Sequence, residues 1–82
     1  MFKQVWEYKK KDIERKLNRE GISANLRSQY LLFGRNLLRK QEKHGWGRIP
    51  QGEIQLLEKQ IKNGLNEKIL KQIIGLIVGS YP

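Results

Sequence analysis

The sequence predicts a small all-α protein, a bundle of about four helices that ends in a hydrophobic helix. Three observations support this fold class. The chain has 82 residues, a length that suits one small helical domain over residues 1–82. Apolar residues recur at spacings of three, four and seven along most of the chain, the spacing that lines one face of a helix. Glycines and one internal proline separate these stretches, at positions that suit turns.

Two helices are expected in the first half of the chain. The first spans about residues 2–20 and ends at Gly21, because glycine readily adopts the left-handed conformation that terminates helices. The second runs from about Ser23, a residue type that caps helix N-termini, to His44, just before a glycine. Gly34 lies inside this second helix at a cost of about 1 kcal/mol relative to alanine. It therefore marks either a close helix crossing or a kink.

The second half, residues 49–82, is expected to form an apolar helical hairpin. Pro50 suits the first turn of a helix, which extends over about residues 51–63. Gly64 suits the turn that follows, and Asn66 can cap the last helix. The apolar positions of the helix before the turn are Ile54, Leu57 and Ile61.

The last helix, over about residues 67–78, is apolar around well over half of its circumference. A surface helix would show one apolar stripe, so this helix is expected to be buried on most sides. It can be buried as the central core element of the bundle, as the seam of a homodimer, or as both together. The residues assigned to this core or dimer contact are Ile69, Leu70, Ile73, Ile74, Ile77 and Val78.

Positive charge is the strongest signal in the composition. The chain has 17 Lys and Arg against 8 Asp and Glu, a formal net charge of +9, and a pI of about 10.1. Residues 1–48 form a basic helical part with 13 basic and 5 acidic residues, whereas residues 49–82 have 4 and 3. Clustered positive charge of this size is typical of proteins that bind phosphates of nucleic acids.

The sequence therefore predicts a small regulatory or accessory protein that binds nucleic acid, with DNA as the favoured target. Its basic helices would contact phosphates, which gives affinity but no sequence information. The size and the lack of cysteine are also typical of small phage, plasmid or bacterial regulators of transcription. The predicted contact residues are Lys9, Lys10, Lys11, Arg15, Lys16, Arg19, Arg27, Arg35, Arg39, Lys40, Lys43, Trp46 and Arg48.

A helix-turn-helix motif over residues 54–75 is one alternative, because this stretch has a glycine between two helices. However, Lys59 and Asn63 stand where that motif requires apolar residues. The second half of the following helix is also too apolar to lie in a wet DNA groove. A plain pair of core helices is the favoured interpretation. The residues that such a helix would offer to bases are Glu67, Lys68, Lys71 and Gln72.

Aromatic residues can stack on the bases of single strands, but most of those in this chain fit the core better. Trp6, Tyr30 and Phe33 fall in apolar stripes. Trp46 stands between two glycines and near Arg48, so it is expected to be the most exposed aromatic residue. It would serve either as a nucleic-acid contact or as an anchor of its loop.

No motif indicates catalysis, a metal or a cofactor. The chain has no cysteine and a single histidine, His44, which excludes Cys-based and His-rich metal sites. His44 suits the end of a helix, where an imidazolium complements the helix dipole. The longest apolar stretch, residues 73–78, is too short to span a membrane, and no secretory signal is visible. A cytoplasmic protein is therefore expected.

Two other functions fit the same charge. A cationic binding module or inhibitor could dock on an acidic protein partner, with the cations steering association. A membrane-active cationic protein is the third choice, because the basic and apolar parts lie in different segments rather than on opposite faces of one helix.

Overall fold

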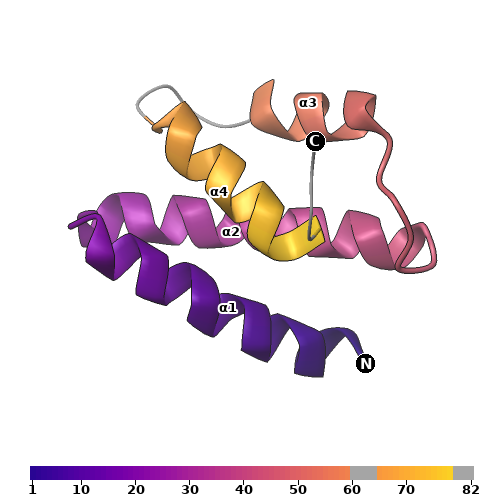
Figure 1. The fold of residues 1–82 in the computed structure, drawn as a ribbon, viewed down its shortest axis with the longest axis horizontal. Helices are drawn as coiled ribbons and strands as arrows, with labels where there is room; N and C mark the ends of the chain where they lie inside the picture. Colours follow the sequence, from indigo (N-terminus) through magenta and orange to yellow (C-terminus); the bar gives the residue numbers. More distant parts are fainter. Residues whose placement is uncertain (60–64, 79–82) are drawn as a thin grey trace.

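The computed structural model describes residues 1–59 and 65–78, and these residues form four helices and no strand (Figure 1). The helices are α1 (Phe2–Arg19), α2 (Ala24–Lys43), α3 (Gln51–Lys59) and α4 (Glu67–Val78). The predicted all-α bundle is confirmed, and the helix ends agree with prediction to within a residue or so where they are described. The predicted continuation of α3 through Ile61 to Asn63 and the turn at Gly64 lie outside the described residues.

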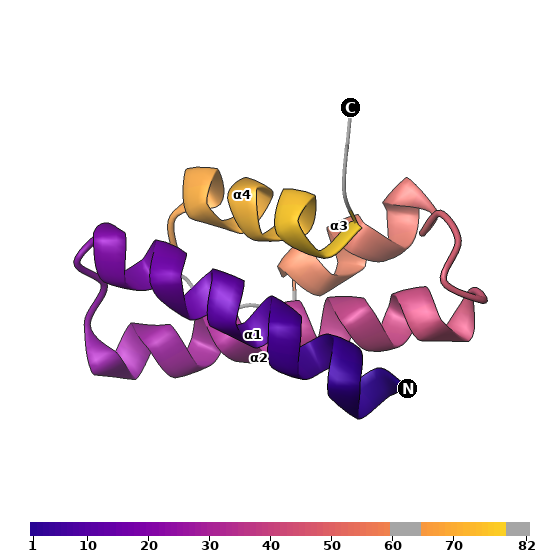
Figure 2. The ribbon, with the colours of Figure 1, turned by 60° about the horizontal axis from the view of Figure 1, so that its bottom comes forward.

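Helix α2 is the centre of the fold. It packs on α1, α3 and α4, and α4 packs on α1 as well. Figure 1 shows α1 on one side of α2 and the pair α3 and α4 on the other. Figure 2 shows α1 passing in front of α2, with α4 above this pair, and α4 contacts both helices. This arrangement leaves the outer faces of α1 and α2, the most basic helices, open to solvent.

Helix α4 supplies the apolar layer that covers α1 and α2. Five of its residues, Ile69, Leu70, Ile73, Ile74 and Ile77, are buried within this single chain. Val78 is half-buried and packs against the same core. Burial of one such side chain stabilises a fold by about 1.5–3 kcal/mol. The core arrangement thus accounts for the apolar character of α4, while the homodimer stays a prediction.

Gly34 marks the place where three helices meet. A Cβ atom at this position would lie 2.6 Å from Cδ1 of Ile13 on α1 and 3.4 Å from Cγ2 of Ile73 on α4. It would also lie 3.8 Å from Cζ3 of Trp6. The absence of a side chain at Gly34 therefore lets α1 and α4 approach α2 closely, and α2 runs as one continuous helix. Of the two predicted roles, the close crossing is correct.

Both glycines at the helix ends adopt the expected left-handed conformation. Gly21 and Gly45 each have φ of +67°. After α1, the Gly21 N–H donates to the Asn18 carbonyl and the Ile22 N–H to the Leu17 carbonyl. After α2, the Gly45 N–H donates to the Glu42 carbonyl and the Trp46 N–H to the Gln41 carbonyl. These paired bonds are Schellman motifs, which satisfy the last carbonyls of each helix.

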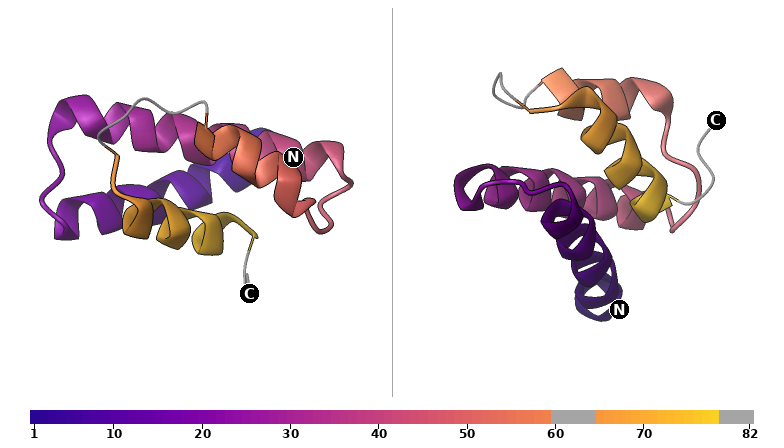
Figure 3. Two further views of the ribbon diagram at one scale, coloured as in Figure 1. Left: turned by 90° about the horizontal axis from the view of Figure 1, so that it is seen from above. Right: turned by 60° about the vertical axis from the view of Figure 1, so that its left-hand side comes forward.

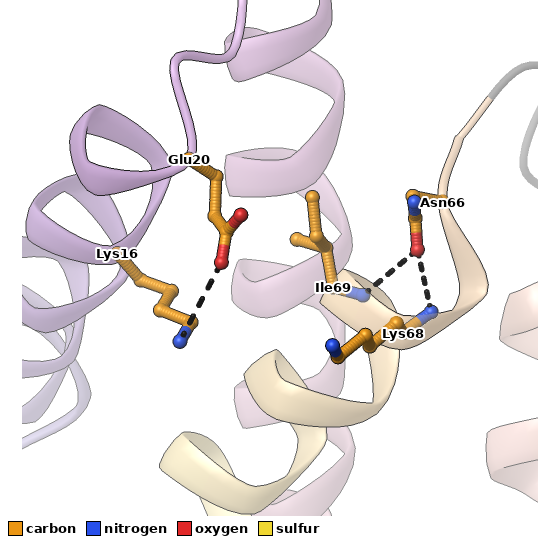
Figure 4. A network of polar contacts seen from close by, with 5 residues as sticks. All are labelled: Lys16, Glu20, Asn66, Lys68 and Ile69. Atoms are coloured by element: carbon orange, nitrogen blue, oxygen red, sulfur yellow. Dashed lines mark hydrogen bonds and ion pairs between the residues drawn. The ribbon is translucent and has the colours of Figure 1, made fainter.

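The helix N-termini differ in how they are capped. The Asn66 side chain caps α4 as predicted, because its Oδ1 accepts the Lys68 N–H at 2.8 Å and the Ile69 N–H at 3.4 Å (Figure 4). The Tyr30 hydroxyl of α2 accepts the Asn66 N–H at 2.7 Å and fixes this cap to the core. Ser23 occupies the N-cap position of α2, but its side chain makes no capping hydrogen bond. The predicted N-cap position of Ser23 is thus confirmed, and the cap differs from that of α4 in lacking a side-chain hydrogen bond.

Candidate nucleic-acid interface

The predicted contact residues differ in exposure. One face of α1 packs on α2 and α4, and α2 packs on all three other helices. An exposed cationic side chain is directly accessible to a ligand. A half-buried lysine or arginine packs its aliphatic stem against the protein and extends its charged group toward solvent. The exposed residues are Lys11, Arg15, Arg19, Arg35, Arg39, Lys43 and Arg48. The half-buried residues are Lys9, Lys10, Lys16, Arg27, Lys40 and Trp46.

A groove between α2 and α3 gathers one group of these cations. Its lining consists of Asn36, Arg39, Lys40 and Lys43 from α2 and Leu57 from α3, and its volume is about 290 Å³. The four α2 positions are spaced i, i+3, i+4 and i+7, so they share one face of the helix. The lining has three cations, one amide and one apolar side chain, and it contains no carboxylate.

An ion-pair cluster holds α3 beside this groove. The Glu53 carboxylate lies 3.6 Å from Lys40 Nζ through Oε1 and accepts a hydrogen bond from His44 Nε2 through Oε2, at 2.5 Å. An ionised carboxylate only accepts, so His44 carries a proton on Nε2 in this contact. The hydrogen bond from His44, together with the charges of His44 and Lys40, lowers the pKa of Glu53 below its usual value of 4.5.

Each partner in the Glu53 cluster also suits its own helix end. Lys40 and His44 belong to the end of α2, and Glu53 lies in the first turn of α3. Cations stabilise helix C-termini and anions stabilise helix N-termini through the helix dipole. The predicted structural role of His44 at a helix end agrees with this geometry, and the contact with Glu53 adds a partner that the sequence did not indicate.

A second groove lies between α1 and α4, with a volume of about 180 Å³. It also contains cations, but its carboxylate, Asp12, lies 4.0 Å from the Arg15 guanidinium. Lys16 pairs with Glu20 at 3.8 Å (Figure 4). The second groove is therefore smaller and closer to neutral than the groove between α2 and α3. Its lining consists of Asp12, Arg15, Lys16, Arg19 and Leu76.

Lys9 has a structural role in this region. Its Nζ donates a hydrogen bond of 2.8 Å to the Leu76 carbonyl, one of the last four of α4. These carbonyls have no partner within their own helix, and α4 has no basic residue in its last turn. Lys9 therefore supplies from α1 the positive charge that a helix C-terminus favours. Of the predicted contact residues, Lys9 is the one most clearly engaged by the fold itself.

Two arginines on α2 also contact the protein. The Arg39 guanidinium carbon lies 4.6 Å from the centre of the Phe2 ring, a cation–π contact, and the Arg39 residue is exposed. Arg27 is half-buried, and its Nε is buried without a hydrogen-bond partner among the described residues. Arg39 is thus oriented at the surface, whereas Arg27 is partly withdrawn from it.

Trp46 is an anchor of its loop, and the expectation that it is the most exposed aromatic residue is wrong. It packs against the core, and its backbone is left-handed, with φ of +65°. It follows Gly45 in the Schellman motif that ends α2, a position where an apolar residue commonly packs back on the helix. Among the aromatic side chains of residues 1–59 and 65–78, Tyr8 is the exposed one, at 76%.

The start of α4 presents the polar residues that a recognition helix would use. Glu67, Lys68 and Lys71 are exposed, and Gln72 is half-buried with its Oε1 lacking a partner in the described residues. The rest of α4 faces α1 and α2, as Figure 3 shows from two further sides. This surface is short, and its charge is mixed.

Residues 1–59 and 65–78 contain no group of three His, Cys, Asp or Glu side chains that could hold a metal ion. Over the same part of the chain, no helix combines the length and the apolar character that crossing a membrane requires.

Sequence reasoning missed two residues of the α2–α3 groove, Asn36 and Leu57. The predicted contact residues were chosen for positive charge, so they include Arg39, Lys40 and Lys43 of this groove but not the uncharged Asn36. A combined spacing of three and four would have placed Asn36 with Arg39 and Lys43. Leu57 was assigned to the core, and it is indeed buried, at 7% exposure, with its remaining surface in the groove.

No protein-family model, curated protein or solved structure matches this chain.

Proposed function

We propose that this protein is a non-enzymatic nucleic-acid-binding protein, with DNA as its favoured target and a regulatory or accessory role. The observation that carries the proposal is the set of outward-facing cations on α1 and α2 that have no carboxylate partner among the described residues. Its exposed members on these two helices are Lys3, Lys11, Arg19, Arg35, Arg39 and Lys43, and the exposed Arg48 follows in the loop after α2. Unpaired cations of this kind release counterions when they meet phosphates, which drives binding.

The shape of the basic surface favours a polyanion. Helices α1 and α2 have 18 and 20 residues and extend about 27 Å and about 30 Å at 1.5 Å per residue. The cations are distributed along this length, as the phosphates of a nucleic acid are. Binding would work by occupancy, because basic helices that neutralise phosphates cover the site that they bind.

An acidic protein partner is the alternative that the same charge allows. Protein interfaces usually have an apolar centre surrounded by a polar rim. The large apolar side chains exposed on the described helices, Tyr8, Leu32 and Leu56, each lie on a different helix. This distribution favours nucleic acid over protein as the partner.

The proposal is tested by fluorescence anisotropy with a labelled duplex of about 30 base pairs, at about 50 mM and about 200 mM salt. We expect micromolar or tighter affinity at the lower salt and a steep fall at the higher salt. Negligible binding at both salt concentrations would contradict the proposal. A pull-down for an acidic protein partner would then be the next experiment.

A further inference from the structure

We propose that the groove between α2 and α3 is the phosphate-binding site of the molecule, where one backbone phosphate is bound by Arg39, Lys40 and Lys43. This inference rests on the proposed function, because it names the part of the basic surface that a nucleic acid contacts most closely. The ligand chemistry is a phosphate group, which a nucleic acid or free inorganic phosphate can supply.

The composition of the groove supports an anionic ligand. Arg39, Lys40, Lys43 and the Asn36 amide lie on one face of α2, and the lining contains no carboxylate. Lys40 also pairs with Glu53 at 3.6 Å outside the lining, so Arg39 and Lys43 are the lining cations without an ion-pair partner among the described residues. Arginine and lysine bind phosphate by charge-assisted hydrogen bonds, which are stronger than neutral ones. The groove between α1 and α4 offers a contrast within the same molecule, because Asp12 in its lining opposes an anion.

The groove also has suitable dimensions and an apolar wall. Its volume is about 290 Å³. A phosphate group of five heavy atoms fits in this volume with part of its hydration shell or the adjoining sugar. Leu57 provides an apolar wall on the α3 side, which the carbon atoms of a sugar can contact.

The Glu53 cluster sets the position of that wall. Glu53 and Leu57 are four residues apart on α3 and so lie on the same side of the helix. The contacts of Glu53 with Lys40 and His44 hold this side of α3 against α2. Glu53 itself does not line the groove, so its carboxylate positions α3 without occupying the space of the ligand. Glu53 and His44 are therefore positioning residues for the site.

Lys43→Ala tests the inference, with Lys11→Ala as a matched control. Both lysines are exposed, both lie on a helix, and neither forms an ion pair within the described part of the chain. Only Lys43 lines the groove. Loss of one phosphate contact should lower the salt slope of duplex binding by about 0.9, which is about an eightfold loss of affinity at about 0.1 M salt. We expect this loss for Lys43→Ala and a smaller loss for Lys11→Ala.

The outcomes separate this inference from the proposed function. If the wild-type protein binds duplex and the two variants lose equal affinity, the groove assignment is wrong while nucleic-acid binding stands. A calorimetric titration of the wild type and Lys43→Ala with inorganic phosphate provides the second arm. If the wild type binds no duplex but binds inorganic phosphate in a manner that requires Lys43, the groove is a phosphate site and the proposed function is wrong. If neither ligand binds, both proposals are overturned.

Discussion

Helix α1 is mainly charged and exposed, whereas helix α4 is mainly apolar and buried. Of the 18 residues of α1, only Ile13 and Leu17 are buried, and much of its remaining surface is basic. Of the 12 residues of α4, five are buried, and its last turn has no basic residue. The contrast teaches that the short helix α4, which supplies five buried core residues, lets the longer helix α1 contribute only two and present charge over the rest of its surface.

The largest expected effect comes from a charge in the apolar helix. Ile74→Asp would place a carboxylate at a side chain that is 2% exposed. A buried charge without a partner costs several kcal/mol, and small domains have only about 5–15 kcal/mol of total stability. We expect the variant to lose its cooperative thermal transition when it is followed by circular dichroism.

A conservative change at the same position provides the control. Ile74→Val should remain folded and lose about 0.5–1.5 kcal/mol. A folded Ile74→Asp protein with a melting temperature near that of the wild type would contradict the role of α4 as the core.

Gly34→Ala tests the crossing at which Ile13 of α1 and Ile73 of α4 approach α2. The new methyl group would meet Ile13 Cδ1 at 2.6 Å. Overpacking costs about 1–3 kcal/mol, and alanine regains about 1 kcal/mol of helix propensity. We expect a net loss of about 1 kcal/mol in the free energy of unfolding by denaturant.

The double variant Gly34→Ala, Ile13→Val shows whether the close contact is the cause. Valine lacks the Cδ1 atom, so alanine at Gly34 should be less destabilising in that background. Equal destabilisation with isoleucine and with valine at Ile13 would mean that the helix crossing is looser than the geometry indicates.

Removal of the α4 cap should have a similar or slightly smaller effect. Asn66→Ala deletes the Oδ1 that accepts the Lys68 and Ile69 N–H groups. Loss of an N-cap costs about 0.5–2 kcal/mol. We expect a decrease of about 1 kcal/mol in stability with nucleic-acid affinity unchanged, because the cap belongs to the packing part of the molecule. A Ser replacement should restore most of the stability.

The smallest effect is expected for Glu53→Gln, which changes the ion-pair cluster beside the groove. The pKa of Glu53 is lowered in the folded protein, so its contribution to stability is present above the unfolded value near 4.5 and is lost as the pH falls through the folded value. At neutral pH, the wild-type protein should therefore have a slightly higher melting temperature than the Glu53→Gln variant.

The pH dependence distinguishes this cluster from a neutral hydrogen bond. The difference in melting temperature should shrink as the pH falls below 4.5 toward the lowered pKa of Glu53. A difference that stays constant across this range would show that the charge of Glu53 contributes nothing.

The sequence predicted the features that depend on neighbouring residues along the chain. Gly21 and Gly45 end their helices as expected, and Asn66 caps α4. The burial of Ile73 and Ile77 follows from apolar residues that surround α4 on most sides. These signals are local, so periodicity and residue type are sufficient to find them.

The candidate site was less predictable because it depends on how helices pack. The groove exists only because α3 lies against α2, which brings Leu57 beside Asn36. The half-burial of Trp46 follows from the turn geometry after Gly45, which redirects the chain toward the core. Lys9 contacts Leu76 across 67 positions of sequence, a distance at which no periodicity gives information.

Binding of nucleic acid at the α2–α3 groove is tested most directly by mapping amide chemical-shift changes when a short DNA duplex is added to the ¹⁵N-labelled protein. We expect the largest chemical-shift changes at the amides of Asn36, Lys40 and Lys43 and smaller changes along the outer face of α1. The amide shifts of Ile73 and Ile77 should not change. Shifts concentrated at Lys68 and Lys71 would contradict binding at this groove, because the start of α4 would then be the contact surface.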